Sequence, residues 1–433
     1  MSVETGFWGV GILFALLLLR VPVALSLIAV SFGGIVSLLG LQPAFGILSN
    51  TPYSFVASWT MSAVPMFLLM GFVAFHARLT EGLFDAAKAL LWRVPGALAV
   101  SSIFACSGFA AVCGSSLATA ASMGRIAIPE MVRAGYSPAI SAGSIAAGGT
   151  IGALIPPSIL MILYGVFSET SITDVFLGGV TVGIITAISY ATIVLILAWT
   201  RPDLIPRGRL EGNQLSIGAA LRKVWPVLVL ILLVFGGLFS GYFTATEAGA
   251  VGAGGAILCA AAVGTLNRKV MKDSLLETLQ TTASLLIIGI GAMMFTRFLG
   301  ITGLSSFISR TIGGADVSYV QLMFMIVVVY LLLGMVMEPF GAMLVTLPVF
   351  LPLLNAEGIS LVWFGVLVVK LLEIGMITPP VGLNVFVIRN VATDYVSTTQ
   401  IFAGVLPFFL ADIAVTVLII AVPSLVLALP GLW

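Results

Sequence analysis

Two pairs of short motifs place helix-breaking and oxygen-bearing residues inside otherwise apolar sequence. The first pair is CGSS at 113–116 and GALIPP at 152–157, and the second is MEPFG at 337–341 and GMITPP at 375–380. Proline lacks an N–H donor and disfavours helix at the preceding residue, so each Pro-Pro sequence should leave backbone carbonyls unpaired. Neutral carbonyl and hydroxyl oxygens can replace the hydration shell of a monovalent cation, and we expect Na⁺.

The candidate metal (Na⁺) ligands form two sets, one for each pair of motifs. The first set is Ser115, Ser116, Gly152, Ile155 and Pro157, and the second is Glu338, Gly341, Gly375, Thr378 and Pro380. The alternative is that the glycines only permit close packing and the prolines only kink helices. Two matched copies favour binding. Glu338 either strengthens a cation site or titrates and carries protons.

A few further residues are candidates for contacts with a substrate. Half-helix N-termini facing a cavity carry partial positive charge and suit a carboxylate. The candidate substrate-binding residues are Arg125, Ser158, Arg297 and Asn384. For Arg125 the alternative is a pair with Glu130 or a side chain that reaches the inner face of the membrane. Lys370 and Glu373 are three residues apart and are expected to neutralise each other, and Asp412 is expected to be structural.

The composition identifies the class of protein that must position these residues. Of the 433 residues, 60% are hydrophobic and only 8% are charged, with a net charge of +1 and a mean hydropathy of +1.21. Ordinary soluble domains are roughly 25% charged, so the low charge excludes a water-soluble fold. The high hydrophobic content excludes a disordered chain, and the net charge near zero excludes a nucleic-acid-binding protein. One histidine, three cysteines without a CxxC pair and no Asp-rich motif argue against an enzyme. We expect no cofactor other than the coupling ion.

The sequence predicts an all-α integral membrane protein. Apolar stretches of about 20 residues are long enough to cross a bilayer. Crossings are predicted near 6–19, 21–40, 61–78, 137–170, 175–199, 224–240, 245–265, 281–299, 360–391 and 400–429. The interrupted stretches 96–134 and 318–356 are predicted to be re-entrant helical hairpins, and 137–170 and 360–391 to be Pro-Pro-broken helices. Residues 81–94 should form a short amphipathic arm.

An internal repeat organises these segments. Superposing GTIGALIPPS on EIGMITPPVG fixes an offset of 223 residues, which also places Ser115 opposite Glu338. The predicted division is therefore a first repeat at 1–200, a cytoplasmic linker at 201–223 and a second repeat at 224–433. Each repeat has five transmembrane crossings, an odd number, so the two should be inverted in the membrane. Inverted repeats with discontinuous helices indicate a secondary transporter.

The distribution of basic residues predicts the orientation. Short cytoplasmic loops accumulate Lys and Arg. The linker carries five basic residues, which are Arg201, Arg207, Arg209, Arg222 and Lys223. We therefore place the linker inside the cell and both termini outside it, on the periplasmic side. The first apolar segment lacks a basic n-region and a cleavage site, and is expected to remain as a membrane span.

At this point the sequence resembles a known family. GSSLATAASMGRIAIPEMVRAGYSP at 114–138 and GGTIGALIPPS at 148–158 resemble the large membrane subunit (M subunit, DctM-like) of tripartite ATP-independent periplasmic (TRAP) transporters. MEPFGAMLVTLPVFLP…ITPPVGLNVFV at 337–387 resembles its second signature. PVALSL near the start also fits. The resemblance thus covers essentially the whole chain.

The resemblance implies an elevator-type transporter of the ion-transporter superfamily in the bacterial inner (cytoplasmic) membrane. It implies Na⁺-coupled uptake (symport) of a small carboxylate. The implied sodium sites use Ser115, Gly152, Ile155 and Pro157, and Glu338 with Gly375, Thr378 and Pro380. The implied partners are a periplasmic substrate-binding protein and a small four-helix membrane subunit, expected as a separate chain because no such segment precedes residue 1. The alternative is a stand-alone Na⁺- or H⁺-coupled carboxylate transporter of the same superfamily that needs no binding protein.

Overall fold

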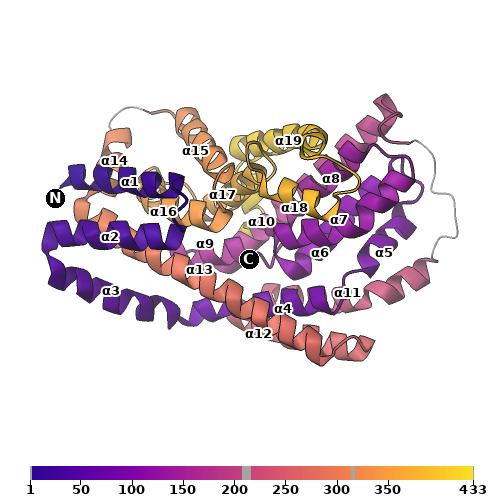
Figure 1. Ribbon diagram of the computed structural model, residues 1–433, viewed down its shortest axis with the longest axis horizontal. Helices are drawn as coiled ribbons and strands as arrows, with labels where there is room; N and C mark the ends of the chain where they lie inside the picture. The colour runs from indigo at the N-terminus through magenta and orange to yellow at the C-terminus, as the bar shows by residue number, and fades with distance from the viewer. Residues whose placement is uncertain (1, 207–215, 314–316, 433) are drawn as a thin grey trace.

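The protein is a bundle of helices. The computed structural model describes residues 2–206, 216–313 and 317–432, and these residues form helices and turns without a strand (Figure 1). Seven of the described helices are long and apolar enough to cross a membrane. The prediction of an all-α integral membrane protein is confirmed. Arg207 and Arg209 of the predicted linker lie outside the described residues.

The first part of the chain, up to residue 200, forms ten α-helices. They are α1 (Val3–Leu18), α2 (Val23–Leu39), α3 (Leu41–Val56), α4 (Ala63–His76), α5 (Gly82–Leu91), α6 (Ala97–Cys113), α7 (Ser116–Arg133), α8 (Pro138–Thr150), α9 (Ile159–Phe167) and α10 (Ile172–Thr200). The predicted first hairpin is α6 and α7, and the predicted first broken helix is α8 and α9. The amphipathic arm expected at 81–94 is α5.

The second part of the chain follows the same pattern. Its described α-helices are α11 (Ile217–Phe239), α12 (Ala245–Val263), α13 (Arg268–Thr302), α14 (Leu304–Gly313), α15 (Tyr319–Gly334), α16 (Pro339–Ala356), α17 (Leu361–Gly375), α18 (Leu383–Val391), α19 (Thr398–Ala421) and α20 (Ser424–Leu427). The second hairpin is α15 and α16, and the second broken helix is α17 and α18.

Helix bounds recur at the offset found in the sequence. Helix α7 spans 116–133 and α16 spans 339–356, so both ends differ by 223 residues. The pairs α6 and α15, α8 and α17, and α9 and α18 correspond within three residues at each end. The opposed orientation of the two repeats in the membrane stays a prediction.

Two helices were not anticipated from the sequence. Helix α3 contains Gln42, Asn50 and Pro52, whose polarity concealed it, and α14 is a short helix of ten residues. At the repeat offset, α3 and α4 together correspond to α13, a single helix of 35 residues. The first repeat breaks this long helix around Ala57 and Ser58, whereas the second keeps it continuous over about 50 Å.

The helices pack in two groups that cut across the two repeats. In one group α13 packs on α2 and α4, and α12 packs on α4 and α11. In the other group α8 packs on α7 and α19, and α17 packs on α15 and α10. Figure 1 shows α2, α3, α12 and α13 along one side of the molecule and the hairpins and broken helices along the other. Both hairpins therefore belong mainly to one body.

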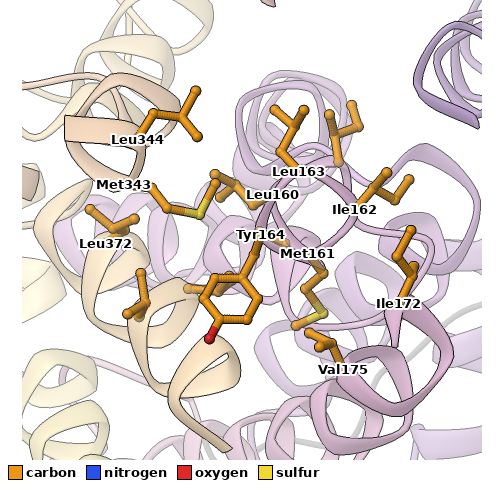
Figure 2. Packing of buried hydrophobic residues seen from close by; sticks show 14 of the residues in the cluster. Leu160, Met161, Ile162, Leu163, Tyr164, Ile172, Val175, Met343, Leu344 and Leu372 are labelled. Atoms are coloured by element: carbon orange, nitrogen blue, oxygen red, sulfur yellow. The ribbon is translucent and has the colours of Figure 1, made fainter. Parts of the chain in front are cut away.

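The core of the second group joins the two repeats directly. Helix α9 places Leu160, Met161 and Tyr164 against Met343 of α16 and Leu372 of α17 (Figure 2). The Tyr164 hydroxyl donates a hydrogen bond of 2.6 Å to the Leu361 carbonyl. These side chains are almost completely buried. The two broken helices are thus held in a fixed relation by close packing.

A buried ionic network also joins the repeats, and it corrects one expectation. Lys370 of α17 pairs with Asp412 of α19, rather than with Glu373 as expected. Tyr190 of α10 donates a 2.6 Å hydrogen bond to the same carboxylate, and Lys370 donates to Thr186 at 3.0 Å. Lys370 and Asp412 are 1% and 0% exposed. Asp412 therefore lies in a buried network that links the two repeats, and its structural role stays a prediction.

Candidate functional site

The tips of both hairpins line one cavity of about 460 Å³. Ser115 and Ser116 reach it from the first hairpin, and Glu338 reaches it from the second. The broken helices contribute Ala153 and Ile159 from one repeat and Glu373 and Met376 from the other, and α4 and α13 close the remaining side. We call this space the central cavity. The repeat motifs, more than 200 residues apart, thus meet at one place.

The first hairpin tip and the first break are in direct backbone contact. A Cβ atom added at Gly152 would lie 3.0 Å from the Ser115 carbonyl oxygen, and one added at Gly114 would lie 2.0 Å from the Pro157 carbonyl oxygen. Gly114 has a φ of +61°, which also favours glycine. Ser115 caps α7, accepting from the Ala118 N–H at 3.4 Å. The backbone of three predicted ligands, Ser115, Gly152 and Pro157, therefore comes together. Ile155 lies in the same break, and its side chain contacts Gly183 of α10.

The second break is arranged differently. Gly375 packs against the end of α15, where an added Cβ would lie 2.4 Å from the Gly334 carbonyl carbon. Thr378 donates a 2.6 Å hydrogen bond to the Ile374 carbonyl, and Pro380 is exposed whereas Pro157 is buried. Of the second predicted set, Glu338 alone is among the residues lining the central cavity. Gly341 lies in α16 and faces Val23 of α2.

Glu373 is a site residue that the sequence reasoning missed. Its side chain is 1% exposed and lines the central cavity, and its Oε2 atom has no hydrogen-bond partner among the described residues. The buried Ser116 hydroxyl, which lines the same cavity from the other repeat, is a polar group that faces the Glu373 carboxylate. The spacing of three residues predicted that Glu373 and Lys370 would neutralise each other. The remote Asp412, which takes Lys370 instead, could not be seen from that spacing.

A polar face on α13 completes the wall. Gln280, Thr281 and Ser284 line the central cavity, and Ile288 follows one turn later. Their spacing of three and four residues is that of one helix face. The sequence carried this signal as LQTTASLL at 279–286, which we did not single out. No Lys or Arg is found among the described residues that line the cavity.

The candidate substrate residues are scattered. Arg125 is exposed and lines a second pocket, away from the central cavity, and Glu130 pairs with Lys88 at 2.7 Å instead of with Arg125. Arg297 is exposed on α13 and is absent from the lining of both spaces. Ser158 is buried and caps α9, accepting from the Met161 N–H at 3.4 Å.

Asn384 ties the second break to the first repeat. Its backbone N–H donates to the Met376 carbonyl at 3.0 Å, across the break. Its side-chain Nδ2 donates to the Ala146 carbonyl of α8 at 3.3 Å, and its Oδ1 is buried without a partner among the described residues. Asn384 therefore fixes the position of α18 beside α8.

Interrupted apolar helices whose breaks meet around a cavity define a membrane transporter. The family described as "Tripartite ATP-independent periplasmic transporter, DctM component" matches residues 10–425. The C4-dicarboxylate TRAP transporter large permease protein DctM of Pseudomonas aeruginosa is 33% identical over 408 residues, covering 91% of this chain and 93% of that protein. The isethionate TRAP transporter permease protein DctMQ of Oleidesulfovibrio alaskensis is 30% identical, covering 96% of this chain and 65% of that protein.

A solved structure supports the fold. The Neisseria gonorrhoeae protein MtrF, described as illuminating a class of antimetabolite efflux pumps, aligns with a TM-score of 0.64 at 15% identity, covering 90% of this chain and 86% of that one. At this identity the likeness concerns the fold alone. The family match spans nearly the whole chain, so the chain belongs to the DctM family of TRAP transporter large permeases.

Proposed function

We propose that this permease takes up a small organic acid by Na⁺-coupled secondary transport, and that the central cavity is its binding site. The observation that carries the proposal is the convergence of both hairpin tips, Ser115–Ser116 and Glu338, on one cavity. A site shared by both repeats can be opened to either side of the membrane by moving one body against the other. The relatives named for C4-dicarboxylate and isethionate support an organic anion as substrate.

The first Na⁺ site in this proposal lies where the first tip meets the first break. Its ligands are oxygens of Ser115, Gly152, Ile155 and Pro157, with Ser116 beside them. The backbone contacts at Gly114 and Gly152 support this arrangement because they hold the oxygen-bearing segments together. A site of neutral oxygens suits Na⁺, because these oxygens can replace the hydration shell of the ion.

The second Na⁺ site is proposed around Glu338, with Gly341, Gly375, Thr378 and Pro380 in the surrounding segments. Glu338 is the N-cap residue of α16, where helix N–H groups point toward the cavity. Because Gly341, Gly375, Thr378 and Pro380 do not line the central cavity, we infer that this site forms when the second break rearranges. In this structure the proposed ligands of the first site are already close together, whereas those of the second site are not.

Movement in this proposal is of the elevator type. The body that contains the hairpins and broken helices slides against the body that contains α2, α4, α12 and α13. The strongest packing within each group supports this, and the groups meet where α13 packs on α16 and α4 packs on α6. In the cell the permease works in the bacterial inner membrane, with its termini in the periplasm, together with a small membrane subunit and a periplasmic substrate-binding protein. The DctMQ relative, whose matched part is 65% of its length, supports a permease that acts with further segments.

The test is uptake of radiolabelled succinate and isethionate into proteoliposomes that contain the permease and its small subunit. We expect uptake to require an inward Na⁺ gradient and a soluble binding protein loaded with the acid. Uptake at full rate without a binding protein would support the stand-alone alternative instead. Uptake that ignores Na⁺ but follows a proton gradient would contradict the sodium sites.

A further inference from the structure

A second polar pocket lies beside the central cavity. It has a volume of about 450 Å³ and is lined by α4, α7, α13 and the segment that leads into α5. The side chains that matter here are His76, Arg78, Arg125, Lys269 and Asp273. We call this pocket the vestibule. It is the place in the structure where Arg125, a candidate substrate residue with no role in the central cavity, is found.

The same helices line the vestibule and the central cavity in the same order. Along α13 the vestibule holds Lys269 and Asp273, and the central cavity begins at Gln280. Along α4 the central cavity holds Gly71 and the vestibule holds His76. The two spaces therefore follow one another along α4 and α13.

One pair of side chains lies between the two spaces along α4 and α13. His76 Nε2 of α4 lies 3.2 Å from Glu277 Oε2 of α13. Glu277 falls between Asp273 of the vestibule and Gln280 of the central cavity on α13. This contact therefore lies between the residues of α13 that line the two spaces.

The two chambers differ in the charges that they offer to an anion. The described lining of the central cavity contains Glu338 and Glu373 but no Lys or Arg. The vestibule contains three permanently basic side chains, and Arg78 is paired with Glu81 at 3.6 Å. Neither Arg125 nor Lys269 is in a salt bridge with another described residue. An acid that leaves the central cavity meets its first free cations here.

We propose that the vestibule binds the carboxylate of the transported acid between the central cavity and the cytoplasm, with Arg125 and Lys269 as the contacts. The inference rests on the proposed function, because it takes the central cavity as the site from which the acid comes. Two acidic side chains also line the vestibule: Glu81, which is paired with Arg78, and Asp273, which is in no salt bridge with another described residue. In this proposal the anion lies between Arg125 of α7 and Lys269 of α13, and Asp273, four residues after Lys269, restricts how close it can approach α13.

The test measures the anion preference of the vestibule without relying on transport. Ser122 also lines it, so we place a cysteine there with Ser122→Cys. Modification from the cytoplasmic side is timed with an anionic and with a cationic methanethiosulfonate of similar size. The unsubstituted chain, in which Cys106, Cys113 and Cys259 are buried, gives the background. The ratio of the two rates reports the local potential.

We expect Arg125→Gln with Lys269→Gln to lower the anionic-to-cationic rate ratio about tenfold. Arg297→Gln, at an exposed arginine outside both chambers, should leave the ratio unchanged. Excess succinate should slow modification by an uncharged maleimide only when Arg125 and Lys269 are present. An unchanged ratio in the double variant, or no protection by succinate or isethionate in the parent, would overturn the vestibule site. The double variant could lower the anionic-to-cationic rate ratio while the parent shows no acid uptake in proteoliposomes. That result would contradict the proposed function, and with it the claim that the vestibule binds a transported acid.

Discussion

Ser115 and Glu338 occupy equivalent positions in the two repeats and line the same cavity. They are 223 residues apart, and each is the N-cap residue of the second helix of its hairpin, α7 or α16. The Ser115 hydroxyl accepts the Ala118 N–H, whereas Glu338 brings a carboxylate to the corresponding position. The repeat has therefore kept the geometry of the tip while changing its charge. This asymmetry allows the two proposed ion sites to differ in affinity.

The first prediction concerns the backbone contact at the first break. We expect Gly152→Ala to raise the Na⁺ concentration for half-maximal uptake at least about tenfold, because its methyl group would press on the Ser115 backbone. The measurement is the initial rate of uptake as a function of external Na⁺. Gly254→Ala on α12 is the matched control, since an added Cβ there meets nothing within 4 Å. Equal Na⁺ dependence in the two variants would remove Gly152 from the site.

The second prediction concerns Glu373. A buried carboxylate with an oxygen, Oε2, that has no hydrogen-bond partner among the described residues destabilises the fold, so we expect Glu373→Gln to raise the thermal unfolding temperature in detergent. The same change should lower uptake about tenfold or more, because a charge retained at this cost is expected to be functional. Thermal unfolding and uptake are measured on one preparation. A lower unfolding temperature together with lower uptake would show that Glu373 only supports the fold.

The third prediction concerns the buried pair Lys370 and Asp412. Replacing one partner leaves an uncompensated charge, which costs about 3–5 kcal/mol in buried sites. We expect Lys370→Met and Asp412→Leu each to reduce the yield of folded protein in gel filtration, and the double variant to recover much of it. Arg78→Gln is the control, because Arg78 and its partner Glu81 are 75% and 52% exposed. A double variant worse than either single change would contradict the pairing.

The fourth prediction concerns the arm α5. Burial raises the pKa of Asp85, but hydrogen bonds and charges from Lys223 and Lys88 outweigh it and hold the pKa below its usual value. A carboxyl group whose pKa is lower in the folded state stabilises that state above its unfolded pKa of about 4, and loses the effect as pH falls further. Asp85→Asn should therefore lower the unfolding temperature slightly at pH 7, which corresponds to a loss of less than about 1 kcal/mol in the free energy of unfolding.

The measurement for Asp85 is the difference in unfolding temperature between the two chains as a function of pH. We expect this difference to shrink as the pH is lowered below about 4, because the folded-state advantage of the carboxylate is then lost. Glu81→Gln, which removes a carboxylate from the exposed pair with Arg78, is the control. A difference that persists unchanged at low pH would show that the contacts of Asp85 do not depend on its charge.

The sequence predicted the parts of the fold that depend on local chemistry. The Gly-Ser and Pro-Pro interruptions predicted where both hairpins and both broken helices change direction. Such breaks can be predicted because the residues that disrupt the helix are themselves visible in the sequence. Helix α3 escaped notice because its polar residues and Pro52 hide a helix that packs on α2 and α13. Residues set by tertiary packing could not be found this way. The approach of Asp412 to Lys370 depends on how α19 lies beside α17.

The residues of the candidate binding site were equally difficult to predict, because tertiary packing decides which cavity a side chain meets. Arg125 and Arg297 were singled out because a charge in an apolar segment is unusual, but that pattern carries no information on which cavity the side chain meets. The structure places Arg125 in the vestibule and keeps Arg297 away from both chambers. The spacing of Glu373 from Lys370 predicted an ion pair between them and gave no reason to place Glu373 in a binding site. Gln280, Thr281 and Ser284 were not predicted to line a site because uncharged polar residues are common in helices. Helix-face spacing on α13 was the available signal for the last three.

The central claim is that both hairpin tips bind the coupling ion. The most direct measurement is the Na⁺ dependence of acid uptake in proteoliposomes by the parent chain, by Ser115→Ala and by Glu338→Ala, with insertion checked by gel filtration. We predict normal insertion and a clearly raised half-saturating Na⁺ concentration in both variants. Uptake with the same Na⁺ dependence in all three proteins would contradict the account.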